Sequence, residues 1–259
     1  MLLIDHFAYN NRFTQVHPGE KALFFVLTMS VCLFLPSLST SLAVTLLMAG
    51  VVVLLAGIPW KFYGKLLLVP GSFLIIGLVA VAVSVTREPC QFLWGTYLGD
   101  YAVGITKAGL DTAVNLFFRS LGAVSCLYFL SLTTPMTEMV GLLRKLRVPA
   151  LVVELITLIY RLIFILLEMA GQIYTAQSSR LGYRSMRTGF TALSQLILSM
   201  FIKSYRQSQN MYDSLVARCY DGQLHFIEDK RNWSLCHVLV IVAVEAVLAA
   251  WALYAGGIM

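Results

Sequence analysis

Two arginines, Arg180 and Arg218, stand where the sequence predicts that long helices end. Gly182 and Gly222 follow them, and glycine just beyond a helix is a common stop signal. A guanidinium stays charged and holds five donors in a fixed plane, so it can grip a carboxylate or the carbonyls of another helix. An arginine that only complements its own helix dipole contributes about 0.3–1 kcal/mol. Two matched arginine ends favour docking to a partner over this local role.

The composition is that of a membrane protein. Of the 259 residues, 59% are hydrophobic and only 12% are charged, whereas soluble domains carry roughly 25% charged residues. Residues 1–20 are too polar for a signal peptide, so we expect none. The five cysteines are scattered without CxxC spacing, which predicts neither a disulfide framework nor a zinc site.

Five apolar segments are long enough to approach the roughly 20 residues that a membrane-spanning helix needs. They cover residues 21–36, 41–58, 66–86, 108–132 and 234–256. Arg119 and Glu245 lie inside two of them. Charges in the bilayer are expensive, so we expect these two to pair with each other or with the Glu154, Arg161 and Glu168 face of a later helix.

The placement of charge predicts the topology. Most of the 19 lysines and arginines lie in one block between residues 144 and 231, and basic segments stay in the cytoplasm. Counting spans back from this block places the amino terminus in the cytoplasm. The net charge of +6 has no aromatic–basic repeat beside it, so we expect no nucleic-acid partner.

Between the fourth and fifth spans the pattern predicts three further helices. Residues 135–147 form a short amphipathic one, 149–181 a long one that begins in the membrane and ends in the cytoplasm, and 190–218 a second long one. The predicted fold is thus an all-α polytopic membrane protein with about five transmembrane helices and two to three cytoplasmic coupling helices. Residues 1–134 hold four spans, 135–232 the cytoplasmic region and 233–259 the last span.

Along nearly its whole length the chain resembles the T component of energy-coupling factor (ECF) transporters, most of all the cobalt-transport T proteins of the CbiQ type. The resemblance depends on the order and spacing of several segments. They are His17-Pro18-Gly19-Glu20-Lys21, Leu143-Arg144-Lys145-Leu146-Arg147, Ile159-Tyr160-Arg161-Leu162, Ser179-Arg180-Leu181-Gly182-Tyr183 and Ala217-Arg218-Cys219-Tyr220-Asp221-Gly222.

The resemblance implies a non-catalytic subunit of an ABC importer for cobalt ion in the plasma membrane of a prokaryote. Its implied partners are two ATPase subunits, a substrate-binding membrane subunit similar to CbiM, a small accessory subunit similar to CbiN, and the lipid bilayer. The ATPases use ATP, and this chain is expected to bind no metal and no cofactor itself. Consistent with that, it has no GxxxxGK[ST] phosphate loop.

The family's hallmark is a pair of Ala-Arg-Gly motifs whose arginines dock into the two ATPases. Carried over residue by residue, the coupling residues are Arg180, Gly182, Ala217, Arg218 and Gly222, with supporting roles for Arg144, Tyr160, Arg161 and Arg184. The match has departures, since Ser179 replaces alanine, Leu181 precedes Gly182 and Cys219 replaces glycine. Cysteine adopts a positive φ less readily than glycine, so we expect the second helix to end later, towards Gly222.

Two alternatives remain. The first is a T subunit that serves nickel or a vitamin, because no residue of this chain is expected to touch the cargo. The second is an enzyme, since residues 213–218 partly match the motif of membrane phospholipid-headgroup transferases. That motif needs later carboxylates for divalent metal, and here Ile227, Arg231 and Leu235 stand in their places.

Overall fold

The computed structural model of the chain describes all residues except 1–2, 36, 87–91, 99–100, 221–232 and 257–259. It divides into two compact units. The first, the bundle unit, comprises Leu2–Pro135 and Lys230–Met259, and the second, the hairpin unit, comprises Met136–Asp229. Each is considered by itself.

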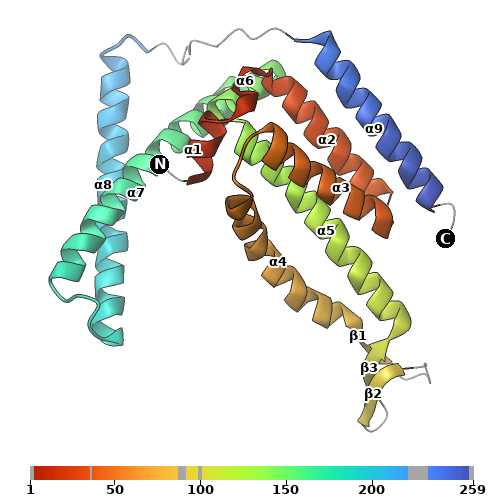
Figure 1. Ribbon diagram of the computed structural model, residues 1–259. Coiled ribbons are helices and arrows are strands. Elements are labelled where there is room, and N and C mark those ends of the chain that lie inside the picture. The colour runs from red at the N-terminus through yellow and green to blue at the C-terminus, as the bar shows by residue number, and fades with distance from the viewer. Residues whose placement is uncertain (1–2, 36, 87–91, 99–100, 221–232, 257–259) are drawn as a thin grey trace. The chain divides into compact units, whose positions relative to one another are not determined.

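In the bundle unit, helix α5 (Lys107–Thr133) is the central element (Figure 1). It packs against α1 (Leu3–Tyr9), α2 (Pro18–Phe34), α3 (Leu38–Gly50) and α4 (Trp60–Ala82), while α9 (Leu235–Gly256) packs on α2 and α3. A 3₁₀ turn, η1 (Arg12–Gln15), precedes α2, and a π-helical turn, η2 (Val51–Leu55), extends α3. The shared core includes Phe24, Val44, Met48, Phe129 and Leu132.

Local signals explain where these helices begin. Pro18 occupies the first turn of α2, where its missing N–H costs no hydrogen bond, and the His17 side chain caps that turn. At the start of α3, Ser37 and Thr40 form a capping box. Gly57 (φ 78°) ends the α3–η2 segment in the left-handed region that glycine adopts without strain.

Three short strands follow α4 and correct the sequence prediction, which continued a helix to residue 86. They are β1 (Val83–Thr86), β2 (Phe92–Leu98) and β3 (Tyr101–Thr106), paired antiparallel in the order β1–β3–β2. Val83 stands opposite Ile105 in the β1–β3 register. Valine, threonine and tyrosine are frequent here, and these residue types favour strands. With this small sheet added, the prediction of an α-helical, polytopic membrane protein is confirmed.

Five helices of the described chain are long and apolar enough to cross a membrane, namely Leu38–Leu55, Trp60–Ala82, Gly109–Thr133, Ala150–Ser179 and Leu235–Tyr254. Four match predicted spans, and the fifth, α7, is the helix expected to begin in the membrane. The predicted first span corresponds to α2, whose 17 residues are at the lower limit for a transmembrane helix. The first turns of α2 and α9 are in contact, so these helices start at the same end, as the predicted topology requires (Figure 1).

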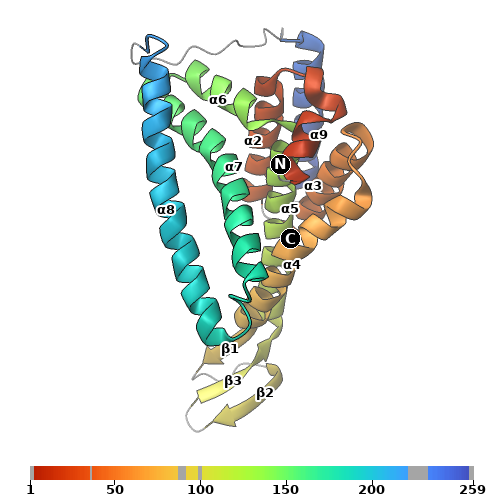
Figure 2. The ribbon, with the colours of Figure 1, turned by 90° about the vertical axis from the view of Figure 1, so that its left-hand side faces the viewer.

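The hairpin unit consists of α6 (Met136–Lys145), α7 (Ala150–Ser179) and α8 (Met186–Val216). Helices α7 and α8 run antiparallel and are joined by a short turn (Figure 2). A capping box of Ser185 and Thr188 starts α8. Large apolar side chains along both helices are exposed, among them Leu151, Leu155, Ile159, Ile163, Ile197 and Phe201. So much exposed apolar surface is typical of a region covered by lipid or another protein.

Candidate functional site: two arginine helix ends

The first arginine end closes α7. Arg180 is the C-cap residue, with φ −93° and ψ 16°, and Leu181 follows in the left-handed region with φ 59°. The Leu181 N–H donates to the Ser178 carbonyl at 3.0 Å, and the Gly182 N–H donates to the Gln177 carbonyl at 2.9 Å. This pair of bonds is a Schellman motif, which satisfies carbonyls that the helix end would leave unpaired.

The second arginine end, at α8, has the same backbone. The Cys219 N–H donates to the Val216 carbonyl at 3.0 Å, and the Tyr220 N–H donates to the Leu215 carbonyl at 3.1 Å. Cys219 has φ 59°, equal to that of Leu181. The expectation that α8 continues towards Gly222 was therefore wrong, because α8 ends at Val216. The two capping bonds offset the cost of a left-handed L-residue, which is about 1–2 kcal/mol. Gly222 lies outside the described residues.

Arg180 and Arg218 consequently occupy equivalent positions. Each directly precedes a left-handed residue, and each is exposed. Ala217 stands immediately before the second arginine, as Ser179 does before the first. Both exposed arginines lie just beyond the last residue of a helix, beside the left-handed residue of its Schellman turn.

The sequence suggested that Gly182 ends helix α7, but the structure gives this glycine another role. Its φ is not positive, and Leu181 takes the left-handed position instead. A Cβ atom at residue 182 would lie 2.9 Å from the Gln177 carbonyl oxygen and 3.4 Å from the Cβ of Ala192. Glycine is needed here because the turn passes close to the end of α7.

Helix α6 ends in a third Schellman motif, but the arginine is displaced by one position. The Arg147 N–H donates to the Arg144 carbonyl at 3.1 Å, and the Val148 N–H donates to the Leu143 carbonyl at 3.3 Å. Arg147 itself is left-handed, with φ 61°, and Leu146 is the residue before it. An arginine directly before the left-handed residue thus distinguishes the ends of α7 and α8 from the end of α6.

Side chains of the hairpin turn support the Arg180 end. Gln177 donates from Nε2 to the Ala192 carbonyl at 2.9 Å, and the Tyr183 hydroxyl donates to Gln177 Oε1 at 2.7 Å. The Tyr183 ring also lies 5.0 Å from the ring of Tyr174, centroid to centroid. A shallow groove of about 360 Å³ between α7 and α8 adjoins this end, lined by Ile173, Ala176, Gln177, Arg180, Gln195, Leu198 and Ser199.

A long-range side-chain hydrogen bond supports the Arg218 end. The Tyr220 hydroxyl donates to Glu154 Oε2 at 3.0 Å. Glu154 lies in the first turns of α7, 66 residues earlier in the chain. This bond ties the end of α8 to the beginning of α7. Neither Tyr220 nor Gln177 was predicted as a site residue, because Glu154 is 66 positions from Tyr220 and Gln177 donates to a main-chain carbonyl, that of Ala192.

The four proposed supporting residues are not gathered at one place. Arg184 lies in the turn after Arg180, where its N–H donates to the Leu181 carbonyl at 3.2 Å. Arg144 is exposed in the last turn of α6. Tyr160 and Arg161 lie near the middle of α7, and at 1.5 Å per residue Arg161 is about 28 Å along the helix from Arg180.

Arg119 and Glu245 do not form the pair that we expected. Buried Glu245 accepts a hydrogen bond from the Thr28 hydroxyl, and Arg119 donates from Nη2 to the Leu33 carbonyl. Both partners belong to α2, which therefore contacts each group separately, while the buried Oε2 of Glu245 has no hydrogen-bond partner among the described residues. Within the part of the chain that the structure describes, no group of three or more His, Cys, Asp or Glu side chains could hold a metal ion.

Comparison with known proteins shows the family of the chain. The family model described as cobalt transport protein, CbiQ, matches residues 10–226. The cobalt transport protein CbiQ of Salmonella typhimurium is 32% identical over 86% of this chain and 98% of its own length. A putative fused cobalt transport protein CbiMQ of Methanocorpusculum labreanum is 30% identical over 88% of this chain, which corresponds to 38% of that longer protein.

A more distant relative extends the comparison. The energy-coupling factor transporter transmembrane protein EcfT of Ruminiclostridium cellulolyticum is 24% identical over 80% of each chain. The match to the CbiQ model covers most of the present sequence, including both arginine helix ends. This multi-pass membrane protein therefore belongs to the CbiQ family of cobalt transport proteins.

Proposed function

We propose that this chain is the transmembrane coupling (T) subunit of an ECF-type cobalt importer and that Arg180 and Arg218 dock it to two ATPase subunits. The observation that carries the proposal is the repeated end geometry, an exposed arginine directly before a left-handed residue in a Schellman turn. Family membership and the name of the EcfT relative support the transporter class. The chain would be non-catalytic, with ATP held by its partners.

The spacing of the two ends favours two separate sockets. Arg180 lies just before α8 and Arg218 just after it. The 31 residues of α8 span about 46 Å at 1.5 Å per residue. One socket cannot hold side chains so far apart. Two copies of the same ATPase would present the same groove twice, which suits two arginine ends with the same backbone.

The exposed apolar faces of α7 and α8 support a second kind of partner. Side chains such as Leu155, Ile163 and Phe201 need lipid or a membrane protein beside them. The name of the fused relative, CbiMQ, joins CbiM and CbiQ in one chain. We therefore propose a CbiM-like substrate-binding subunit as the membrane partner, with a small CbiN-like accessory subunit as a further member of the complex.

In this proposal the hairpin unit transmits force. ATP binding would close the two ATPases and move their grooves together. The arginine ends would follow, and the paired helices α7 and α8 would pass the movement towards the membrane subunits. Arginine suits such a contact because its planar donors can engage a carboxylate and helix carbonyls at the same time.

The test is co-purification of the ATPases with the Arg180→Ala/Arg218→Ala double variant from membranes. Removing one partner of a buried charge pair costs about 2–5 kcal/mol, so losing both contacts should abolish association. Lys203→Ala/Arg206→Ala is the matched control, since it removes two exposed basic side chains of α8 that are not at helix ends. The control should retain the ATPases. Normal co-purification of the double variant would refute the docking role.

The cargo is tested separately by uptake of radioactive Co²⁺ into cells or vesicles that contain the whole complex, with Ni²⁺ as competitor. The proposal predicts Co²⁺ uptake that requires ATP and that the arginine double variant lacks. Uptake of Ni²⁺ in preference to Co²⁺ would assign the same subunit to a nickel importer.

A further inference from the structure

The start of α2 contacts the end of α5 and the start of α9, the two bundle segments next in sequence to the hairpin unit. Helix α5 ends at Thr133, two residues before the boundary at Pro135. The chain returns at Lys230, and α9 begins soon afterwards at Leu235. Two adjacent charged residues of α2, Glu20 and Lys21, reach these two helix ends, and both side chains are buried.

Lys21 contacts the end of α5, where the chain leaves the bundle unit. Its Nζ donates to the Thr133 carbonyl at 2.9 Å, and only 3% of the residue is exposed. Asn11 adds a second contact, because its Nδ2 donates to the Leu132 carbonyl at 3.3 Å. A cation at the last carbonyls of a helix both satisfies hydrogen bonds and complements the helix dipole.

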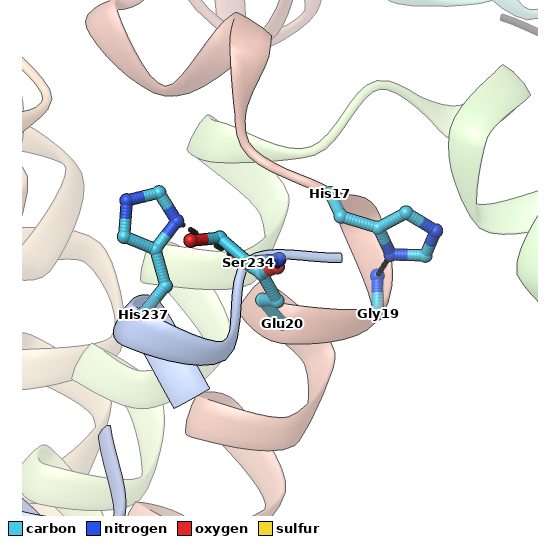
Figure 3. A network of polar contacts seen from close by, with 5 residues as sticks. All are labelled: His17, Gly19, Glu20, Ser234 and His237. Carbon is cyan, nitrogen blue, oxygen red and sulfur yellow. Dashed lines mark hydrogen bonds and ion pairs between the residues drawn. The ribbon is translucent and has the colours of Figure 1, made fainter. Parts of the chain in front are cut away.

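Glu20 contacts the start of α9, soon after the chain re-enters the bundle unit (Figure 3). Its Oε1 accepts the Ser234 N–H at 2.8 Å, and its Oε2 lies 3.0 Å from His237 Nδ1. Glu20 is 1% exposed. A carboxylate here satisfies an N–H that the start of α9 would leave unpaired, and it lies at the positive end of that helix dipole.

The backbone beside Glu20 is shaped for the same contact. The rings of His17 and Trp233 lie 4.8 Å apart, centroid to centroid. A Cβ atom at Gly19 would be 2.7 Å from Cζ2 of Trp233, so only glycine allows the segment before α9 to approach the first turn of α2 so closely. His17 accepts the Gly19 N–H at 2.9 Å through Nδ1 and fixes that turn.

We propose that Glu20 and Lys21 are positioning residues that hold the end of α5 and the start of α9 against the first turn of α2. The inference rests on the proposed coupling function. A movement that the chain passes from the hairpin unit into α5 or α9 then also reaches α2. Two buried charges on one turn are costly without partners, and here their partners are the last carbonyl region of α5 and the first turn of α9.

The test compares transport and ATP hydrolysis in vesicles that contain the complete complex with its ATPases and metal-capture subunit. Glu20→Ala and Lys21→Met should each lower the Co²⁺ transported per ATP hydrolysed by about fivefold, the scale of one lost hydrogen bond. Both variants should still bind the ATPases, because Arg180 and Arg218 are intact. Ser30→Ala is the matched control on α2, since its hydroxyl donates only to Val26 of the same helix.

A merely structural role would change the amount of assembled complex without changing transport per ATP. That result, or a ratio within twofold of wild type in both variants, would overturn the inference. Glu20→Gln and Lys21→Arg keep an acceptor for Ser234 and a donor for Thr133, so each should recover most of the coupling.

If Glu20→Ala fails to assemble, Lys21→Met decides on its own, because it removes the Nζ donor to the Thr133 carbonyl and leaves Glu20 in place. A ratio about fivefold below wild type is expected, and a ratio within twofold of wild type overturns the inference. The proposed function fails by a different result, namely ATPase binding that does not depend on Arg180 and Arg218.

Discussion

The two arginine ends share a backbone and differ in what supports them. At the Arg180 end, Gln177 and Tyr183 hold the turn through contacts within a few residues of the end and with the start of α8. At the Arg218 end, Tyr220 reaches across to Glu154 at the beginning of α7. The first support is local to the turn, whereas the second spans the hairpin from the end of α8 to the start of α7.

This difference separates two properties of a docking element. The Schellman backbone sets where the guanidinium leaves the helix, and it is the same at both ends. The supporting contacts decide how firmly each end is held. We therefore expect the arginines to contribute equally to ATPase binding and the two ends to respond differently when their supports are removed.

The largest effect should come from Arg180→Ala and Arg218→Ala as single variants. Each should weaken ATPase binding by about 2–5 kcal/mol, and the two losses should be similar because the ends are equivalent. Binding of purified ATPase to the chain in nanodiscs, measured by surface plasmon resonance, gives both values. A large loss for one arginine and none for the other would break the equivalence.

Arg180→Lys and Arg218→Lys sharpen the same measurement. Lysine keeps the charge but loses the planar fork of donors. Weakened binding in both lysine variants would show that geometry matters in addition to charge. Full binding would reduce the contact to a simple charge interaction.

Gly182→Ala should damage the first end alone. The new Cβ would meet the Gln177 carbonyl at 2.9 Å, and overpacking of this kind costs about 1–3 kcal/mol. Gly189→Ala is the control, because its Cβ would find the nearest atom, Cδ1 of Tyr183, at 3.8 Å. Thermal unfolding should show a lower Tm for the first variant and a nearly unchanged Tm for the second.

Tyr220→Phe and Tyr183→Phe test the supports directly. Each removes one hydroxyl donor and should cost about 0.5–1.5 kcal/mol. Hydrogen–deuterium exchange should rise around residues 215–219 in the first variant and around residues 177–182 in the second. Since the Tyr220 bond joins two distant helix ends, exchange should also rise at the start of α7 in that variant only. Equal changes at both ends in either variant would contradict separate supports.

The smallest effect is expected from Leu181→Gly and Cys219→Gly. Glycine removes the left-handed penalty of about 1–2 kcal/mol but adds backbone entropy to the unfolded chain, so each variant should gain at most about 1 kcal/mol. The gain should be the same at both ends because both residues have φ 59°. A clear loss of stability in thermal unfolding would show that the side chains of these two residues matter more than their backbone.

Much of this architecture follows from local patterns in the sequence. Apolar length predicts four of the five candidate spans, and Arg180 and Arg218 are visible from their places at the ends of periodic segments. The left-handed residues are not visible in this way, because Leu181 and Cys219 are not residue types that favour a positive φ. Gly182 indicated the correct turn, but its own φ is not positive, and glycine is required there because the backbone passes close to Gln177.

Contacts between residues far apart in the chain could not be predicted from the sequence for another reason. Glu20 and Ser234 are separated by 214 positions, and Tyr220 and Glu154 by 66, so no periodicity joins them. The small sheet after α4 was missed because its strand-forming valines continue an apolar segment that already predicted a helix. The predicted pair of Arg119 and Glu245 is not formed, because each side chain makes a hydrogen bond to α2 instead.

The most direct test of the central claim uses the natural thiol beside Arg218. Cys219 is exposed and occupies the same position as Leu181 in the other motif. In a background with Cys90 and Cys236 replaced by serine, Cys219, or Leu181→Cys combined with Cys219→Ser, places a single accessible thiol at one end or the other. We predict that a maleimide–diazirine reagent attached to either thiol forms a crosslink to an ATPase subunit on illumination. Crosslinks from neither position, or labelling of both thiols by a membrane-impermeant maleimide on intact cells, would contradict it.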